Sequence, residues 1–165
     1  MNRVETRLAY VGIGSNLDDP GRQVRAAIEA LKHLPRSTFA GASRLYRTAP
    51  WGRLDQPAFV NAAAAISTAL SPCELLDALL AIERAHGRTR DGERWGPRVI
   101  DLDLLVFGDA TIDEPGLHVP HPRLAERAFA LLPLADLAPD LEIPGQGVVR
   151  TLAGRIDASE CTPLA

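Results

Sequence analysis

The sequence is poor in cysteine and aromatic residues, and it has no long apolar segment. Cys73 and Cys161 are its only cysteines, and neither belongs to a CxxC pair or to a histidine pair with metal-ligand spacing. A disulfide scaffold, a zinc ribbon and a dithiol redox motif are therefore excluded. Residues 1–7 lack the apolar region of a signal peptide, and no stretch approaches the roughly 20 apolar residues of a membrane-spanning helix. We expect a cytoplasmic protein without membrane contact.

Lysine is almost absent, although positive charge is not. Lys32 is the only lysine among 18 basic residues, and the formal net charge is -3. A coding bias toward arginine and alanine would explain this count without any function. The net negative charge excludes a general binder of nucleic acid or membrane surfaces, because such proteins need a broad basic field. Any cationic site must therefore be local.

The length and the hydrophobic content predict one domain that spans residues 1–165. A chain of 165 residues with 46% hydrophobic side chains can bury a core of ordinary size. No repeat, low-complexity linker or break in charge marks a second domain. Both cysteines are expected to be ordinary thiols.

Hydrophobic periodicity and turn signals predict alternating strands and helices. Strands are expected over residues 8–13, 38–46, 59–68 and 99–107. A helix is expected over residues 20–34, with proline at its first position and Pro35 at its end. A second helix, over residues 71–87, opens with the capping box Ser71-Pro72-Cys73-Glu74 and closes at Gly87. Residues 48–57 are too irregular for either element.

The chain continues beyond this core with smaller elements. A hairpin is expected over residues 112–119, then a helix over residues 122–132 that Pro133 breaks. A short strand pair over residues 141–149 and a helical tail from Thr151 complete the chain. The order β-α-β-β-α-β predicts an α+β protein, namely a ferredoxin-like α/β sandwich with an antiparallel sheet and extra C-terminal elements.

Two aspartates on one predicted strand give the strongest chemical signal. In Asp101-Leu102-Asp103-Leu104 the carboxylates point to the same face, with Cα atoms about 7 Å apart for a rise of about 3.3 Å per residue. Like charges at this spacing need a compensating partner, such as Mg²⁺ bound together with phosphate oxygens. Solvated carboxylates or salt bridges to arginine explain the spacing equally well, so both alternatives remain open.

An arginine-rich segment directly precedes these aspartates. Four arginines fall within eleven residues: Arg88, Arg90, Arg94 and Arg98. Guanidinium groups bind phosphate oxygens bidentately, so arginines beside metal-binding carboxylates are typical of phosphoryl transfer. Gly92 and Gly96 would let the loop close over a substrate, and Trp95 would stack on a ring. The alternative is an exposed loop whose charge Asp91 and Glu93 neutralise.

Other motifs carry less information by themselves. His121 lies between two prolines, with Arg123 and Arg127 after it, and a lone histidine of this kind favours a structural hydrogen bond over a phosphate contact. Gly12-x-Gly14 lacks the third glycine and the later acidic residue of a dinucleotide loop. The G-x-x-x-x-G-K-[ST] pattern of a P-loop is also absent.

Taken together, the segments resemble the 6-hydroxymethyl-7,8-dihydropterin pyrophosphokinase family of folate biosynthesis. The matching segments follow the family's order over nearly the whole chain: residues 9–17 (AYVGIGSNL), 45–48 (LYRT), 55–62 (DQPAFVNA), 94–103 (RWGPRVIDLD) and 119–123 (VPHPR). The segment R-W-G-P-R-x-x-D-L-D is long and irregular, which makes a chance match implausible.

The resemblance implies transfer of the β,γ-pyrophosphoryl group of ATP to the hydroxymethyl oxygen of the pterin, with release of AMP, on a ferredoxin-like fold. Asp101 and Asp103 would hold two Mg²⁺ ions that bridge the ATP phosphates, and Asp103 would be the catalytic one of the pair. The family's cationic positions toward ATP correspond here to Arg88, Arg90, Arg94, Arg98, His121 and Arg127. Among them, Arg88 and Arg98 would clamp the transferring phosphates.

The resemblance also implies a pterin site. The ring would lie between Trp95 and Phe129, while Thr48, Phe59 and Asn61 would contact its edge. Glu83 stands where the family has an acidic residue that supports the arginines.

Four positions depart from the family's pattern. Leu80, Trp51 and Pro122 put the adenine-side contacts and loop motion in doubt rather than the reaction, and Phe59, in place of a frequent tyrosine, costs at most one hydroxyl contact.

Two other functions fit parts of the sequence. A metal-dependent nucleotidyltransferase also uses a Gly-Ser turn and a D-x-D pair, but Asp101 follows Ser15 by 86 residues rather than about a dozen. A non-catalytic RNA-binding module on this fold would need a basic sheet face with aromatic residues, which the two aspartates oppose. The expected partners are ATP and the pterin alone, with no nucleic acid, and the expected state is a monomer.

Overall fold

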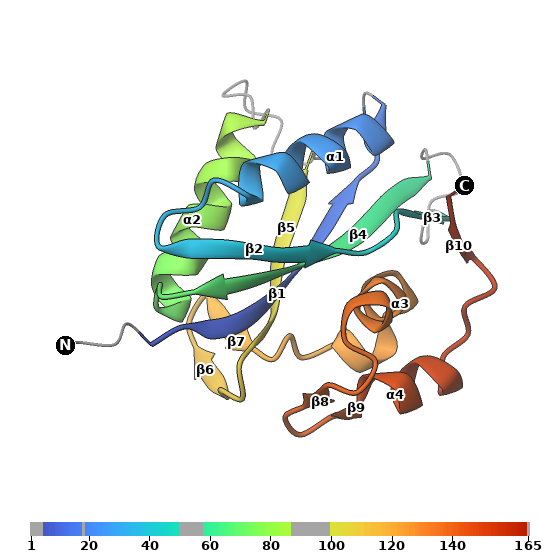
Figure 1. The fold of residues 1–165 in the computed structure, drawn as a ribbon. Helices are drawn as coiled ribbons and strands as arrows, with labels where there is room; N and C mark the ends of the chain where they lie inside the picture. The colour runs from blue at the N-terminus through green and yellow to red at the C-terminus, as the bar shows by residue number, and fades with distance from the viewer. Residues whose placement is uncertain (1–4, 18, 50–57, 87–99, 165) are drawn as a thin grey trace.

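An antiparallel sheet forms the centre of the molecule (Figure 1). The computed structural model describes residues 5–17, 19–49, 58–86 and 100–164. In these ranges the sheet has six strands: β1 (Arg7–Ser15), β2 (Ser37–Ala42), β3 (Tyr46–Thr48), β4 (Phe59–Thr68), β5 (Asp101–Phe107) and β10 (Cys161–Pro163). The strand order is β10-β3-β4-β1-β5, and β2 also pairs with β4.

The connections between the strands confirm the ferredoxin-like α+β fold. Helix α1 (Pro20–Leu31) joins β1 to β2, and helix α2 (Pro72–Ala85) joins β4 to β5. The strand expected over residues 38–46 is wrong as one element, because it divides into β2 and β3, which pair with opposite halves of β4. At the break, Ser43 bonds twice to Ala63: its backbone N–H donates to the Ala63 carbonyl, and its hydroxyl accepts the Ala63 backbone N–H, both at 2.8 Å.

Helices α1 and α2 cover one face of the sheet. Helix α1 begins after Asp19, whose carboxylate accepts the Arg22 N–H, and it buries its apolar stripe against β1 and β4. It ends at Leu31, three residues before the expected end. The capping box of α2 is confirmed, since Ser71 and Glu74 each bond to the other's backbone N–H. The residues buried between this face of the sheet and the two helices form the larger hydrophobic core.

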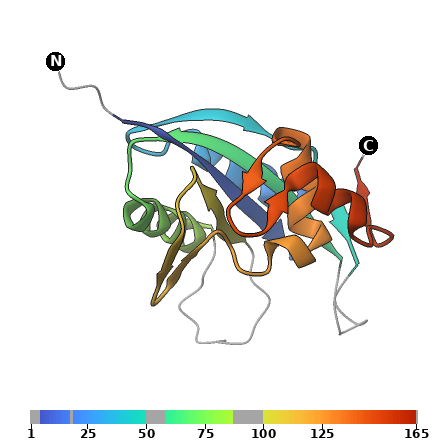
Figure 2. The same cartoon turned by 90° about the horizontal axis from the view of Figure 1, so that it is seen from below.

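The opposite face is covered by helix α3 (Ala128–Leu137) and the elements after it (Figure 2). Between β5 and α3 lie the 3-10 turn η1 (Leu124–Glu126) and the hairpin of β6 (Ile112–Glu114) and β7 (Leu117–Val119), whose Leu117 and Val119 belong to the core on the α1 and α2 face. The helix expected over residues 122–132 is wrong in both bounds, because α3 starts at Ala128 and continues through Pro133. Leu131 and Leu134 are fully buried on α3, so their packing outweighs the hydrogen bond that the proline lacks.

The C-terminal segment returns to the sheet. The expected strand pair is present as β8 (Glu142–Ile143) and β9 (Gly147–Val148), and helix α4 (Val149–Arg155) begins two residues before Thr151. Strand β10 was not expected, because three residues with a proline carry no strand signal. Pro163 is tolerated there because β10 ends the strand order of the described sheet. Cys161 on β10 is buried, Cys73 is exposed, and both are free thiols.

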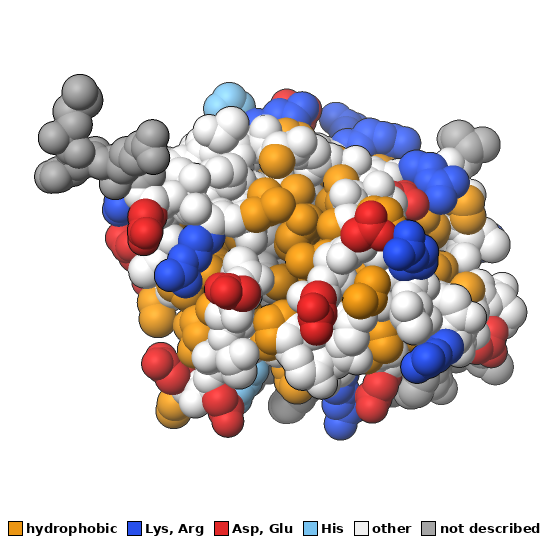
Figure 3. Space-filling view, turned by 60° about the horizontal axis from the view of Figure 1, so that its bottom comes forward, with side chains coloured by type: hydrophobic (Ala, Val, Ile, Leu, Met, Phe, Trp, Pro, Cys, Tyr) orange, Lys and Arg blue, Asp and Glu red, His pale blue; other side chains and the backbone are white. Residues whose placement is uncertain are grey.

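The surface is mixed in charge. On the face shown in Figure 3, acidic and basic side chains lie interspersed around a central group of apolar side chains. Within the ranges that the structure describes, no helix is long and apolar enough to cross a membrane.

Candidate active site

A pocket of about 280 Å³ lies on the α3 face of the sheet. Strands β1, β3, β4 and β5 supply its floor, while the segment after β7 and the start of α3 supply the opposite wall. Eight residues selected from the sequence line it together: Thr48, Phe59, Asn61, Asp101, Asp103, His121, Arg127 and Phe129. The fold therefore brings into one cavity residues that are as far apart in the chain as β3 and α3.

The register of the sheet explains how the floor is built. Asp101 pairs with Gly14, and Gly14 pairs on its other side with Asn61. Two residues further along β5, Asp103 pairs with Gly12. Because side chains of a strand alternate between faces, Gly12 and Gly14 share the face of the two aspartates. The glycines thus leave space beside both carboxylates.

Gly14 also brings the backbone close to Asn61. A Cβ atom at Gly14 would lie 2.8 Å from the Asn61 Oδ1 atom, which real Cβ atoms do not tolerate. A Cβ atom at Gly12 would lie 3.4 Å from the Leu105 side chain, a tight contact. Glycine at position 14 is therefore required by the close approach of Asn61 and not by backbone conformation.

The two aspartates lie at the start of β5. Asp101 is half-buried and Asp103 is exposed, whereas Leu102 between them is buried in the core of the other face. The carboxylate of Glu83, buried on α2, accepts the Leu102 backbone N–H at 3.1 Å. This bond fixes the strand between the two carboxylates. No local pattern in the sequence predicts this contact of Glu83.

The carboxylate pair is suited to a hard divalent cation. Among the described residues, no group of three or more His, Cys, Asp or Glu side chains has the arrangement of a complete metal site. Mg²⁺ commonly takes one or two carboxylates from the protein and fills its shell with waters and substrate phosphates. Two carboxylates on one face, with the side-chain-free glycines beside them, match that pattern.

Thr48 and Asn61 form a hydrogen-bonded pair on the floor. The Asn61 Nδ2 atom donates to the Thr48 hydroxyl at 2.8 Å, and this hydroxyl points to the Cys161 Sγ atom at 3.9 Å. All three residues are buried, and burial raises the pKa of the Cys161 thiol. Since Nδ2 is committed to Thr48, the amide orientation is fixed and Oδ1 lies beside Gly14.

The opposite wall combines cationic and aromatic groups. The Arg127 guanidinium lies 5.6 Å from the centroid of the Phe129 ring. Burial lowers the pKa of the half-buried His121, Asp103 opposes this effect, and the charges of Arg127 and Arg123 add to it. All of these effects except that of Asp103 favour the neutral imidazole. Its Nδ1 atom accepts the Arg123 backbone N–H at 3.2 Å, which leaves the ring proton on Nε2.

Some predicted site residues lie outside the described part of the chain. These are Arg88, Arg90, Arg94, Trp95 and Arg98, and Trp51 is also outside it. Among the described departures from the family's pattern, Leu80 is half-buried on α2 and Pro122 is exposed after His121.

Sequence reasoning missed several groups that shape the pocket. Gly12 and Gly14 were noted only as an incomplete dinucleotide loop, yet their spacing of two residues equals that of Asp101 and Asp103 and places both pairs on one face. This shared two-residue period could have predicted that the two glycines lie beside the two aspartates. The support of Thr48 by Cys161 had no local signal, because it depends on pairing between β10 and β3.

Comparisons with known proteins identify the family. Residues 10–139 match the family model of 7,8-dihydro-6-hydroxymethylpterin-pyrophosphokinase. A 2-amino-4-hydroxy-6-hydroxymethyldihydropteridine pyrophosphokinase of Pseudomonas aeruginosa is 53% identical over 135 residues, which cover 82% of this chain and 83% of that protein. An enzyme of the same name from Methylorubrum extorquens is 47% identical over 151 residues, which cover 92% of this chain and 94% of that one.

Solved structures show the same fold. The wild-type HPPK-DHPS protein of Plasmodium falciparum superimposes with a TM-score of 0.72 at 16% identity, over 92% of this chain. The chain spans 45% of the length of that protein. The family match and the relatives agree, and the chain belongs to the 7,8-dihydro-6-hydroxymethylpterin-pyrophosphokinase family.

Proposed function

We infer that the chain transfers the pyrophosphoryl group of ATP to 6-hydroxymethyl-7,8-dihydropterin, giving AMP and the pterin diphosphate in folate biosynthesis. Membership of the family carries this assignment. The supporting structural observation is that one pocket contains the Asp101 and Asp103 carboxylates, the Thr48–Asn61 pair and Phe129. These groups suit a phosphate-bound cation, a polar heterocycle edge and a flat ring, respectively.

We assign the pterin to the floor of the pocket. Asn61 presents its fixed Oδ1 acceptor to the donor groups of the ring edge, and Thr48 holds that amide in place. Phe129 stacks on the ring from the α3 side, and Phe59 contacts its edge. Trp95 would complete the stack from the other side. The hydrogen bond between Asn61 and Thr48 exists before substrate arrives, so little ordering of the site is needed on binding.

We assign the phosphates of ATP to the space between β5 and the opposite wall. Asp101 and Asp103 would hold two Mg²⁺ ions, which supply neutralisation of the phosphate charge. Arg127, and His121 through its Nε2–H, donate to phosphate oxygens from the other side. Arg88, Arg90, Arg94 and Arg98 would add cationic groups, with Arg88 and Arg98 on the transferring phosphates.

The chemical step needs little from the protein beyond position and charge. The pterin hydroxyl oxygen attacks the β-phosphorus, the bond from that phosphorus to the α,β-bridging oxygen breaks, and AMP departs. Asp103, the exposed carboxylate on the pocket side of β5, accepts the hydroxyl proton. The fixed strand position, held through Glu83 and Leu102, keeps this carboxylate beside the reacting atoms.

Variants of the two aspartates test the assignment. Asp101→Asn and Asp103→Asn keep side-chain size but remove the charge, so each is expected to lower kcat by about 100- to 1000-fold, as for loss of a main electrostatic group. Asp109→Asn is the matched control, because Asp109 is an exposed aspartate just after the same strand. Turnover in each variant is measured with Mg²⁺, ATP and the pterin, and circular dichroism checks the fold. Full activity in both variants would contradict the metal assignment.

The monomeric state, the cytoplasmic location, the lack of nucleic-acid partners and the single domain over residues 1–165 stay predictions.

A further inference from the structure

A side chain of the β8–β9 hairpin reaches the wall of the pocket. Gln146 is half-buried in the turn between β8 and β9. Its Nε2 atom donates to the His121 carbonyl at 3.0 Å, and its Oε1 atom accepts the Ala125 backbone N–H at 3.1 Å. An amide donates only through nitrogen and accepts only through oxygen, so one orientation makes both bonds. Gln146 therefore bridges two backbone positions of residues 121–125.

This bridged segment carries groups that line the pocket. The His121 backbone N–H donates to the Leu105 carbonyl on β5 at 2.9 Å, and its ring accepts the Arg123 N–H. Arg127 follows η1 and precedes the first residue of α3. Between β7 and α3, a stretch that the structure describes in full, the only regular element is the three-residue η1. The Arg127 carbonyl accepts the Ala130 and Leu131 backbone N–H groups of α3, whereas the backbone of His121 belongs to neither a helix nor a strand. The position of His121, and the approach of the chain to Arg127, therefore depend on individual hydrogen bonds.

The hairpin that supplies Gln146 is firmly anchored. Ile143 on β8 and Val149 directly after β9 are fully buried in the core beneath α3. The Gln146 backbone N–H also donates to the Ile143 carbonyl at 2.9 Å, which closes the turn. The anchored hairpin therefore holds the Gln146 amide in place, and the two hydrogen bonds of this amide restrain residues 121–125.

We propose that Gln146 is a positioning residue for ATP, which holds the segment of His121 and Arg127 at the distance that phosphate oxygens require. This proposal rests on the proposed function, because it takes that segment to be the ATP side of the pocket. Gln146 lies beyond residues 10–139, the stretch that matches the family model. Loss of its bonds is expected to affect ATP and to spare the pterin, whose floor contacts come from β3 and β4.

Two substitutions separate the two bonds of Gln146. Gln146→Leu has a similar size and removes both bonds. Gln146→Glu retains an acceptor for the Ala125 N–H but loses the donor to the His121 carbonyl. Glu142→Ala is the control, because Glu142 is an exposed residue of the same hairpin. Each full-length variant is assayed for kcat and for the KM of ATP and of the pterin separately.

The expected result is a split between the two substrates. Gln146→Leu should raise the KM for ATP about fivefold or more, as expected for a loss on the order of one hydrogen bond. The KM for the pterin should stay within about twofold, and Gln146→Glu should fall between wild type and Gln146→Leu. Glu142→Ala should match wild type in both constants.

A spectroscopic readout on the free protein gives independent evidence. At about pH 8 the imidazole is neutral, and its ¹⁵N shifts report which nitrogen carries the proton. Wild type should show a single Nε2–H tautomer for His121, and Gln146→Leu should show a mixture, because the Arg123 N–H no longer stays aligned with Nδ1. Glu142→Ala should keep the single tautomer.

Two results would overturn the proposal. One is a Gln146→Leu enzyme with an unchanged KM for ATP and an unchanged tautomer. The other is an equal rise of both KM values together with a lowered melting temperature, which would make Gln146 a general stabiliser only. Failure of the proposed function is distinguishable from both, because wild type would then form no AMP while the ¹⁵N spectra would still report on the segment.

Discussion

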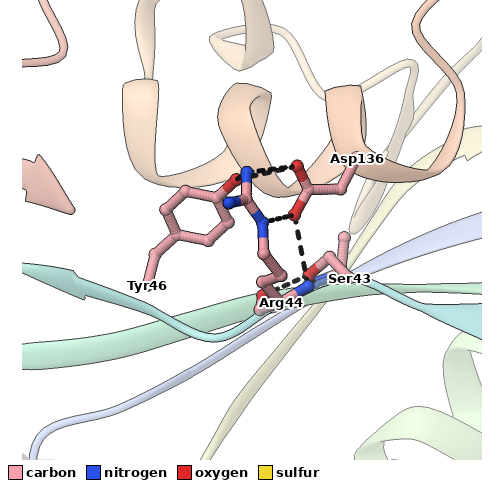
Figure 4. Close-up of polar contacts among 5 residues, drawn as sticks. Ser43, Arg44, Tyr46 and Asp136 are labelled. Carbon is pink, nitrogen blue, oxygen red and sulfur yellow. Dashed lines mark hydrogen bonds and ion pairs between the residues drawn. The ribbon is translucent and has the colours of Figure 1, made fainter. Parts of the chain in front are cut away.

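The buried phenol of Tyr46 makes a quantitative prediction about stability at high pH. Tyr46 is 4% exposed at the start of β3, and its hydroxyl donates to Asp136 Oδ1 on α3 at 2.8 Å. The Arg44 guanidinium donates to the same hydroxyl at 2.9 Å and forms an ion pair with Asp136 (Figure 4). Burial, then the Asp136 carboxylate, raise the pKa of Tyr46 to about 12.

The raised pKa of Tyr46 determines the sign and the size of the change in folding stability at high pH. The unfolded chain loses the Tyr46 proton near the ordinary pKa of about 10, whereas the folded protein holds it to about 12. The stabilisation is therefore fully present below about pH 10 and is lost as the pH rises through the folded pKa. Two pKa units correspond to about 2.7 kcal/mol, of which about 2 kcal/mol is lost by pH 12.

Tyr46→Phe isolates this contribution, because phenylalanine does not titrate. Urea unfolding of wild type and Tyr46→Phe is compared at intervals from about pH 8 to about pH 12. At the lower end the variant should be less stable by about 1 kcal/mol, the usual value of one hydrogen bond. Wild type should then lose about 2 kcal/mol more than the variant between pH 9 and pH 12. Tyr10, whose pKa burial also raises, is present in both proteins and cancels. Parallel curves over this range would refute the reasoning.

Two further predictions concern single contacts. Gly14→Ala places a Cβ atom 2.8 Å from Asn61 Oδ1, so the KM for the pterin should rise roughly tenfold in steady-state kinetics. Gly41→Ala is the control, because its Cβ atom would make an ordinary contact of 3.7 Å with the Leu137 side chain, and it should leave this KM unchanged. An unaltered KM in Gly14→Ala would remove Asn61 from the pterin site. Hydrogen bonds from Arg44 and Tyr46 lower the pKa of Asp136 against the effect of burial, so its stabilisation is present above about pH 4 and is lost as the pH falls. Urea unfolding should therefore show a smaller loss between about pH 5 and about pH 3 in Asp136→Asn than in wild type, and equal losses would contradict this account.

The central part of the fold follows from local patterns in the sequence. Alternation along a strand is enough to place Asp101 and Asp103 on one face, and the same period applies to Gly12 and Gly14. The capping box at Ser71 marks the start of α2 because both of its hydrogen bonds lie within one turn. Such features depend on neighbours in the chain, so the sequence is sufficient to predict them.

The parts that were missed depend on contacts between distant segments. Helix α3 continues through Pro133 because Leu131 and Leu134 are buried against the sheet, a benefit that no local rule contains. Strand β10 forms only because β3 offers an edge for pairing. The bridge from Gln146 to His121 joins positions 25 residues apart through a turn that shows no motif. These three features arise from side-chain burial, strand pairing and hydrogen bonds that exist only in the folded state.

The most direct test of the central claim follows the β-phosphate of ATP. Wild-type protein is mixed with Mg²⁺, 6-hydroxymethyl-7,8-dihydropterin and ATP labelled with ³²P at the β-position, and the products are separated. Transfer of the intact pyrophosphoryl group predicts that all transferred label appears in the pterin product and that the AMP formed in equal amount is unlabelled. Label that stays in ADP, beside a pterin monophosphate, would contradict the account.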